Sequence, residues 1–386
     1  MSTLGIGVIG VAGRGTLARH VDDVPGAAIV AGADVSEEAR AAFAARYPDA
    51  FVAADYRELL EQPAVEAVII ATPDFLHEEH AIAALSSGRA VYLEKPIAIT
   101  TEGADRVLDA ARRSGSKLFL GHNMRYFPAI LKMKEIIDSG LIGDIQAVWC
   151  RHFVAIGGDA YFRDWHSERK NTTGLLLQKG AHDIDVIHWL AGGYTSSVVA
   201  MGKLSVYDKP PRREPGGSEN ARIDAGRWPP LEQNDFSPII DVEDHNMVLM
   251  QFANGIQASY LQCHYTPDYW RNYTFIGTKG RVENIGDTGT AKIHVFTSRL
   301  DGRTEPDVVH YLKPSAGGHG GSDPAIVRAF VEFVRNGTPV NTSPVAARYA
   351  VAAGVAATQS IRGDSRKVDI PELPQDLIDY FENGQV

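Results

Sequence analysis

The sequence predicts an α/β fold in two parts: an N-terminal Rossmann domain with a doubly wound parallel sheet, and a C-terminal α/β domain with a large, mostly antiparallel open sheet. Up to about residue 120, short apolar runs alternate with segments of helical character, which is the pattern of parallel βαβ units. A glycine-rich loop follows the first apolar run. Beyond residue 190, most strand-like runs follow one another without helices between them, which indicates an antiparallel sheet.

The first strand is predicted at the apolar run Ile6–Ile9, directly before the glycine-rich loop. A glycine at the start of such a loop permits a tight turn, small residues let the backbone approach a pyrophosphate, and a last glycine lets the next helix pack on the strand. The segment 16–20 is then expected to present a helix N-terminus to the phosphates. An ordinary glycine-rich turn is the alternative. The cofactor contacts expected here are Gly10, Ala12, Gly13, Arg14 and Gly15.

The second strand, residues 28–33, ends at Asp34, close to the spacing of roughly 20 residues at which dinucleotide-binding folds place an acidic residue. A carboxylate there accepts hydrogen bonds from ribose hydroxyls and repels a 2′-phosphate. Neither Val35 nor Ser36 supplies a cation for that phosphate, so NAD is favoured over NADP. The same Asp is also compatible with a helix N-cap.

The remaining elements follow from apolar periodicity and from turn residues at their ends. Helices are expected at 36–47, 56–61, 75–87, 101–114, 128–139, 174–190, 323–336 and 344–362. Strands are expected at 50–54, 67–71, 90–93, 117–121, 145–153, 198–207, 245–252, 256–264, 273–277, 281–284 and 292–297. We therefore predict a NAD-binding domain at 1–122 and a substrate-binding and oligomerisation domain at 123–386. Residues 208–240, rich in proline, glycine and charge, are expected to form a loop insertion, either a surface loop or a subunit-contact arm, with disorder as the alternative.

The amino-acid composition of the chain excludes several classes of partner and site. The formal net charge of −10 argues against a nucleic-acid or membrane partner. Only Cys150 and Cys263 are present, so no disulfide framework is implied, and no metal site is predicted. The first residues lack the features of an export signal, and no apolar run is long enough to span a bilayer, so a cytoplasmic enzyme is expected.

Several motifs together resemble the Gfo/Idh/MocA family, the relatives of glucose–fructose oxidoreductase and inositol dehydrogenase. The matching stretches are 7–15, 72–77 (Thr-Pro-Asp-Phe-Leu-His), 94–96 (Glu-Lys-Pro), 121–126 and 174–185. The resemblance implies a Rossmann domain followed by an open sheet that often mediates oligomers, so a homodimer or homotetramer is expected. It also implies a sugar, cyclitol or sugar-derivative substrate.

The resemblance assigns roles to residues of the N-terminal domain. Thr72, Pro73 and His77 would lie on the nicotinamide side of the cofactor crevice, and Glu94 would help to position the nicotinamide ribose. Lys95 would contact the cofactor and lie between it and the substrate, where partial desolvation favours proton transfer. A solvated lysine before a turn is the alternative for Lys95.

The motif at 174–185 departs from the family pattern, in which an Asp precedes the His by four positions. Here Gln178 occupies that position, while His182 is retained and Lys179 adds a cation. Because Gln cannot ionise, it can orient a hydroxyl but cannot act as a base. We therefore predict Lys95 and His182 as the catalytic residues, and Gln178, Lys179 and His182 as substrate contacts. A satisfied structural histidine is the alternative for His182.

Further substrate contacts are expected where aromatic, cationic and hydrogen-bonding side chains gather, because sugar sites favour that mixture. A role in surface structure is the alternative for each. Their basic character favours an anionic or highly hydroxylated substrate. These residues are Arg163, Trp165, His166, His264, Arg271 and His319.

The function predicted is hydride transfer between NAD and a hydroxyl or keto carbon, with Lys95 or His182 moving the hydroxyl proton. An NAD-dependent glycoside hydrolase is the alternative: transient oxidation acidifies a neighbouring C–H, and elimination, water addition and re-reduction follow with recycled NAD. A non-catalytic NAD sensor is a third hypothesis, which the retention of Lys95 and His182 disfavours.

Overall fold

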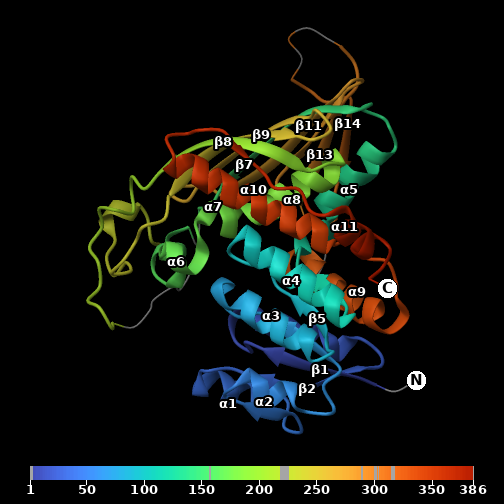
Figure 1. The fold of residues 1–386 in the computed structure, drawn as a ribbon. Helices are drawn as coiled ribbons and strands as arrows, with labels where there is room; N and C mark the ends of the chain where they lie inside the picture. The colour runs from blue at the N-terminus through green and yellow to red at the C-terminus, as the bar shows by residue number, and fades with distance from the viewer. Residues whose placement is uncertain are drawn as a thin grey trace. The chain divides into compact units, whose positions relative to one another are not determined.

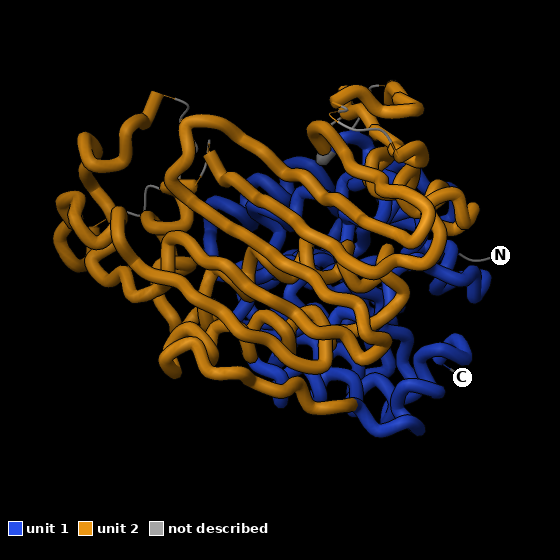
Figure 2. The backbone as a smooth tube through the Cα atoms, turned by 90° about the horizontal axis from the view of Figure 1, so that it is seen from above, with its two compact units in different colours: residues 1–126, 315–348, 373–386 blue, residues 127–314, 349–372 orange. Residues whose placement is uncertain are grey.

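The computed structural model describes residues 3–155, 158–217, 226–287, 290–299, 302, 304–313 and 318–385. Contacts divide the chain into two compact units (Figure 2). Unit 1 comprises 1–126, 315–348 and 373–386, and unit 2 comprises 127–314 and 349–372. The domain boundary that the sequence places after residue 122 stays a prediction. By contacts, the segments 315–348 and 373–386 belong to the same unit as the N-terminal residues.

Unit 1 is built on a six-stranded, wholly parallel sheet with the strand order β3-β2-β1-β4-β5-β6 (Figure 1). The order reverses between β1 and β4, which is the switch point of a doubly wound fold. The predicted Rossmann architecture is therefore confirmed. The strands are β1 (Leu4–Ile9), β2 (Ala27–Ala33), β3 (Phe51–Ala53), β4 (Ala67–Ile70), β5 (Ala90–Leu93) and β6 (Leu118–Leu120).

The helices of unit 1 begin where the sequence offers caps. Ser36 accepts a hydrogen bond from Ala39 N, and Thr100 accepts one from Gly103 N, so α1 and α4 start as expected. The helices are α1 (Glu37–Arg46), α2 (Tyr56–Leu60), α3 (His77–Ser86), α4 (Thr101–Ser114), α9 (Ser322–Asn336) and α11 (Gln375–Glu382), with 3₁₀ segments η1 (Gly13–Asp23), η2 (Asp74–Leu76), η3 (Asn123–Tyr126) and η7 (Gly318–Gly321). The sequence did not predict α11.

Helix α9 belongs to the core of unit 1 although it lies some 200 residues beyond β6. Phe330 packs edge-on against Tyr92 of β5 and Phe119 of β6, with ring centroids 5.6 Å apart in both pairs. All three rings are fully buried. Burial of aromatic side chains of this size explains why the returning segment joins the parallel sheet.

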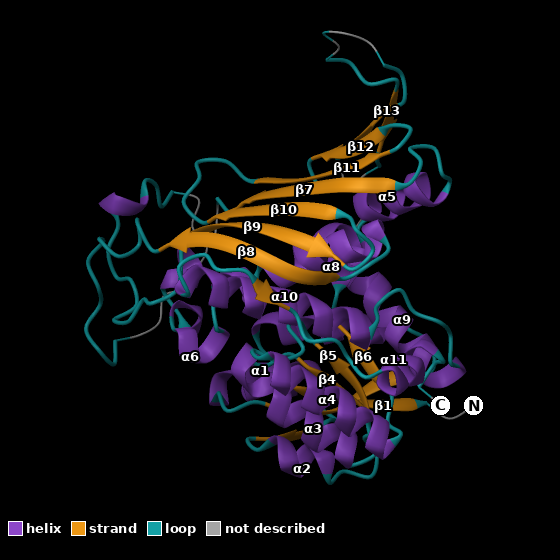
Figure 3. Cartoon of the chain, turned by 45° about the horizontal axis from the view of Figure 1, so that its top comes forward, coloured by secondary structure: helices purple, strands orange, loops and turns teal. Residues whose placement is uncertain are grey.

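Unit 2 holds a nine-stranded sheet of order β14-β13-β12-β11-β7-β10-β9-β8-β15 (Figure 3). Only β7 and β10 pair in parallel, so the predicted mostly antiparallel sheet is confirmed. The strands are β7 (Ile145–Phe153), β8 (Thr195–Lys203), β9 (His245–Phe252), β10 (Gln257–Cys263), β11 (Trp270–Gly277), β12 (Arg281–Ile285), β13 (Lys292–Phe296), β14 (Val308–Tyr311) and β15 (Val368–Asp369). The sequence did not predict the two short strands β14 and β15.

One face of this sheet is covered by α5 and α8 (Figure 3). The helix expected at 174–190 is divided at Lys179 into α7 and α8, and the backbone of Lys179 itself keeps helical φ and ψ. The helical elements are α5 (Pro128–Asp138), α6 (Arg169–Thr172), α7 (Leu175–Gln178), α8 (Gly180–Ala191) and α10 (Pro344–Arg362), with 3₁₀ segments η4 (Asp159–Phe162), η5 (Trp165–Ser167) and η6 (Pro230–Glu232).

The loop predicted at 208–240 is partly packed rather than simply exposed. Within its described residues, 208–217 and 226–240, the regular secondary structure consists of η6 and an isolated β-bridge between Arg212 and Phe236. Phe236 is fully buried in a small cluster with Phe162 and Tyr207. Residues 218–225 lie outside the described chain. In the described chain, no helix is long and apolar enough to cross a membrane.

Candidate active site

The glycine-rich loop joins β1 to η1, and two of its glycines are required by geometry. Gly10 has φ of +81°, where side chains are strained, and a Cβ on Gly15 would lie 1.8 Å from the Gly10 carbonyl oxygen. A Cβ on Gly13 would meet no atom within 4 Å, so the space beside it is open. The segment 16–20, predicted to begin a helix, lies inside the 3₁₀ helix η1, which already starts at Gly13.

Asp34 lies at the carboxyl end of β2, beside this loop. Its carboxylate accepts hydrogen bonds from Val11 N at 3.0 Å and Ser36 N at 2.9 Å. These two contacts hold the carboxylate between the loop and the start of α1, at the place where a dinucleotide fold binds the adenosine ribose. The Asp34 side chain is half-buried, so it can still accept further hydrogen bonds.

Arg14, one of the predicted cofactor contacts, is engaged by carboxylates of its own unit. Its Nε lies 2.7 Å from Glu94 Oε1, and its Nη2 lies 2.9 Å from Asp323 Oδ1. Burial opposes the charged form, but the Glu94 and Asp323 carboxylates outweigh it and raise the pKa of Arg14. Arg14 therefore ties the loop to the end of β5 and the start of α9.

His77 connects the two loops that follow β4 and β5. Its Nδ1 lies 2.6 Å from the Pro96 carbonyl oxygen, and its Nε2 lies 2.8 Å from the Thr72 carbonyl oxygen. The Thr72 hydroxyl lies 3.1 Å from Nδ1 of His80, whose pKa is lowered to about 4 by burial. His77 thus braces the crevice predicted for the nicotinamide, and both of its ring nitrogens are occupied.

Lys95 follows β5 directly, between Glu94 and the cis peptide bond to Pro96. Glu94 is 5% exposed, and it accepts hydrogen bonds from the Tyr92 hydroxyl at 3.1 Å and from Lys95 N at 3.2 Å. The Lys95 side chain is half-buried. The carboxylate of Glu94 therefore fixes the backbone from which Lys95 projects.

These residues fit a dinucleotide because the carboxyl ends of parallel strands meet at one edge of the sheet. The slim loop follows β1, Asp34 follows β2, Thr72-Pro73 follows β4 and Glu94-Lys95 follows β5. The open space beside Gly13 and the strict need for glycine at 10 and 15 are what close approach of a pyrophosphate requires. Unit 1 thus holds the cofactor residues that the sequence predicts, with Arg14 and His77 in bracing contacts.

In unit 2, α8 is anchored to the sheet by Asp183, the residue after His182. Its carboxylate accepts hydrogen bonds from the hydroxyls of Tyr260, at 2.7 Å, and Tyr273. It also lies 2.9 Å from Nδ1 of His152 and 3.2 Å from Nε of Arg271. Asp183, His152 and both tyrosines are at most 1% exposed. We call Asp183, His152, Tyr260, Arg271 and Tyr273 the Asp183 network.

Within the Asp183 network, burial and the neighbouring charged groups determine the pKa of each ionisable side chain. Burial raises the pKa of a carboxyl, but Arg271, His152 and the Tyr273 hydroxyl outweigh burial and hold the pKa of Asp183 well below its usual range. Burial and the charge of Arg271 lower the pKa of His152 to about 3, so its imidazole is neutral at pH 7. Arg271, predicted as a substrate contact, is 6% exposed and is committed to this network and to Asp287, 3.4 Å away.

Three predicted substrate residues gather around the ring of Tyr161. Nζ of Lys179 lies 5.4 Å from its centroid, and the rings of His166 and His264 lie 4.9 Å and 5.3 Å from it. Trp165 stacks on His166 with centroids 3.6 Å apart. We call Tyr161, Trp165, His166, Lys179 and His264 the Tyr161 cluster. Its mixture of aromatic faces and basic groups is what the sequence analysis expected of a sugar site.

The other residues predicted to bind the substrate lie outside the Tyr161 cluster. Arg163 is 2% exposed, its Nε lies 3.3 Å from Asp159 Oδ2, and its guanidinium group lies over the ring of Phe236. Gln178 is 6% exposed at the end of α7, and His182 is half-buried in the first turn of α8. The backbone of His319 lies in η7, and its side chain is outside the described structure. No local sequence pattern marks His152, Asp183 or the two tyrosines, so none of them is among the predicted site residues.

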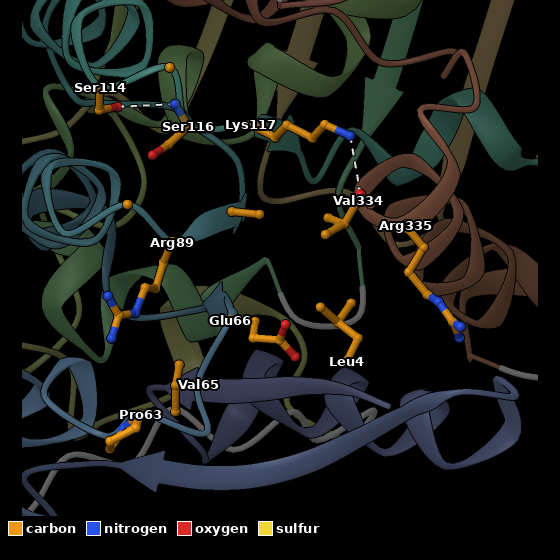
Figure 4. A pocket seen from close by; sticks show the side chains of 13 residues that line it. Leu4, Pro63, Val65, Glu66, Arg89, Ser114, Ser116, Lys117, Val334 and Arg335 are labelled. Carbon is orange, nitrogen blue, oxygen red and sulfur yellow. Dashed lines mark hydrogen bonds between the residues drawn. The ribbon is translucent and has the colours of Figure 1, made fainter. Parts of the chain in front are cut away.

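A separate pocket of about 750 Å³ lies at the amino ends of the unit 1 strands, away from the glycine-rich loop (Figure 4). Its cations serve the structure. Nζ of Lys117 donates to the carbonyls of Phe333 and Val334 at the end of α9, and Arg89 donates to the carbonyls of Leu60 and Ser87. Such contacts satisfy helix C-termini. Among the described residues, no group of three or more His, Cys, Asp or Glu could hold a metal ion.

Comparison with known proteins agrees with this geometry. An inositol 2-dehydrogenase of Saccharopolyspora erythraea is 30% identical over 81% of this chain and 80% of its own length. One from Ralstonia nicotianae is 35% identical over 51% of this chain and 57% of its own length, so that match spans little more than half of the relative. The structure of levoglucosan dehydrogenase in complex with NADH has the same fold, with a TM-score of 0.80 at 22% identity over 96% of this chain and all of that one.

Two family models match most of the chain. The model of the NAD-binding Rossmann fold of the oxidoreductase family covers residues 4–122, and that of its C-terminal alpha/beta domain covers residues 134–370. The order of the two matches is the order of the two sheets. The chain therefore belongs to the Gfo/Idh/MocA family of oxidoreductases, as its motifs predict.

Proposed function

We propose that this protein is an NAD-dependent dehydrogenase that oxidises a hydroxyl carbon of a sugar, a cyclitol or one of their derivatives, or reduces the corresponding ketone. The observation that carries the proposal is the placement of Lys95 in unit 1. It follows β5 at the same sheet edge as the glycine-rich loop and Asp34. The inositol and levoglucosan dehydrogenases among its relatives support a polyhydroxylated substrate.

When bound, NAD would supply the hydride acceptor at C4 of its nicotinamide ring. In this proposal, Asp34 binds the ribose hydroxyls and disfavours a 2′-phosphate, so NAD is preferred over NADP. Lys95 and His182 accept and relay the hydroxyl proton, while Gln178 orients the substrate as a neutral hydrogen-bonding group. Glu94 holds the backbone of Lys95 through its contact with Lys95 N.

The test is a substrate panel given to the purified protein with NAD, with NADP and with neither. Free sugars, cyclitols, acidic sugars and aryl glycosides are compared, and NADH formation and aglycone release are followed together. Net reduction of NAD, with a lower rate on NADP, is the expected result. Aglycone release without net NADH would instead establish the NAD-recycling glycosidase. Absence of both reactions across the panel would contradict the proposed function.

We further propose that the protein forms a homodimer or homotetramer through the exposed face of the unit 2 sheet. On β8 and β9, Val199 pairs with Leu249 and Met201 with Met247, and these side chains are 36–64% exposed. Trp149 of β7 extends the same apolar face, which contains a hollow of about 470 Å³. Contiguous exposed apolar side chains of this kind are typical of interfaces.

Replacing Leu249 with glutamate is expected to shift the protein toward the monomer, because it buries a charge at the centre of this face. The mass in solution, measured by light scattering after size exclusion, checks the result. Ile239→Glu is the matched control, since Ile239 is also exposed, at 53%, but lies outside the sheet. A wild-type monomer, or an oligomer unaffected by Leu249→Glu, would contradict this interface.

A further inference from the structure

Lys179 is a half-buried cation without a counter-charge. Among the described residues, no carboxylate lies within 4 Å of its ammonium group and no hydrogen bond to it is formed; its contact is the face of Tyr161. Nearby carboxylates are used elsewhere: Asp164 lies 2.7 Å from Nδ1 of His166, and Asp183 is held by its own network. An ammonium group offers three donors and no acceptor, so this one is available to an anion.

Lys179 stands at the junction between α7 and α8. Its φ and ψ of −91° and −40° are helical, and its backbone N–H donates to the Leu175 carbonyl oxygen at 2.9 Å, so the chain stays helical across the junction. The junction therefore fixes the backbone of Lys179, whose ammonium group lies against the ring of Tyr161.

His264 gives a second, independent indication of a ligand in this cluster. Its side chain is fully buried between Tyr161 and Phe162, and neither ring nitrogen has a hydrogen-bond partner in the described part of the chain. Burial, with the charges of neighbouring basic groups including Lys179, lowers the pKa of His264 and keeps the ring neutral. A neutral imidazole offers one donor and one acceptor, as a sugar hydroxyl requires.

We propose that the Tyr161 cluster selects a carbohydrate with an anionic substituent, a carboxylate or a phosphate, which Lys179 binds while His264 meets a hydroxyl. This inference rests on the proposed function and names the substrate class of the same site. A neutral sugar would leave the Lys179 ammonium without a counter-charge, whereas an acidic sugar would neutralise it. His166 differs from Lys179, because it is already paired with Asp164. Its ring packs against those of Tyr161 and Trp165 and adds no uncompensated charge to the cluster.

The experiment compares acidic sugars with their neutral counterparts: D-glucuronate with D-glucose, D-galacturonate with D-galactose, and glucose 6-phosphate with glucose. Affinity is measured by calorimetry with NAD present, and kcat/KM by NADH formation. In at least one pair the wild type is expected to prefer the acidic member by about tenfold or more, as a charge-assisted hydrogen bond allows. Lys179→Gln is expected to remove about tenfold of this preference, mainly through KM, and Lys179→Arg to keep most of it.

Lys170→Gln is the matched control, because Lys170 is an exposed lysine of the same unit that is paired with Glu168. It should leave the ratio of acidic to neutral affinity as in the wild type. Equal or weaker binding of every acidic sugar, or an acidic preference that survives Lys179→Gln, would overturn the inference. NADH formation from neutral sugars alone would overturn it and leave the proposed dehydrogenase standing. Acidic sugars bound through Lys179 without NADH formation from any sugar would support the anion site and contradict the dehydrogenase.

Discussion

Replacing Lys95 with methionine is expected to lower kcat by about 10²- to 10⁴-fold, which is the usual contribution of a general acid or base. Methionine keeps much of the length of the side chain and cannot carry a proton. The Glu94 contact to the backbone of residue 95 does not involve the side chain, so the local fold should persist. Steady-state turnover of the substrate found by the panel, together with NADH binding followed by fluorescence, checks this result. Affinity for NADH should change much less than kcat.

Lys117→Met is the matched control, because Lys95 and Lys117 are the two lysines of unit 1. Lys117 precedes β6, at the opposite edge of the same sheet, and its ammonium group bonds to the end of α9. Its loss should cost some stability and leave turnover intact. Lys95→Arg should keep the positive charge without restoring proton transfer, because arginine is not deprotonated in proteins. Full turnover in Lys95→Met would remove Lys95 from the mechanism.

The shared sheet edge of the predicted cofactor residues could be inferred from the sequence because each of these residues lies next to a predicted strand. The glycine-rich loop follows β1, Asp34 ends β2, and Glu94-Lys95 ends β5, so a strand prediction places all of them at one edge of a parallel sheet. Even there, the partners of Arg14 were missed. Asp323 is more than 300 residues away in the chain, and no spacing rule connects it to the loop.

The partners of the predicted substrate residues could not be inferred from the sequence, because their charged groups pair across the fold. Arg163 and Arg271 have the composition of ligand contacts, but the structure buries them against Asp159 and Asp183. A sequence pattern reports which residues are charged and does not report the strand register that brings them together. The interruption at Lys179 was missed for a related reason, since residues on both sides of it have helical periodicity.

Replacing Asp183 with asparagine is expected to destabilise the protein strongly. The substitution keeps the shape of the side chain but removes the negative charge that compensates Arg271 in a fully buried setting. Breaking a buried ion pair from one side costs about 3–5 kcal/mol, and Asp287, 3.4 Å from Arg271, moderates the loss. Thermal and urea unfolding at pH 7 measure the change. Asp208→Asn, at an exposed position of the same unit, should have little effect.

The same network predicts how stability depends on pH. The folded pKa of Asp183 lies below the ordinary value of 3.8, so the stability from its carboxylate is present above about pH 4 and is lost as the pH falls through the folded pKa. His152 has its pKa lowered from 6.5 to about 3, so the unfolded chain binds its proton first and stability falls as the pH drops from 6.5 toward 3. The wild type should therefore lose stability over both intervals.

Unfolding curves of the wild type and Asp183→Asn between pH 8 and pH 2.5 separate the two contributions. The variant should still lose stability between pH 6.5 and pH 4, because His152 remains buried and must be protonated there. Below about pH 4 its curve should be flatter than that of the wild type, because it no longer has a carboxylate at position 183 to protonate. Parallel curves below pH 4 would show that the charge of Asp183 does not hold α8 to the sheet, and the anchoring would then depend on the hydrogen bonds from Tyr260 and Tyr273.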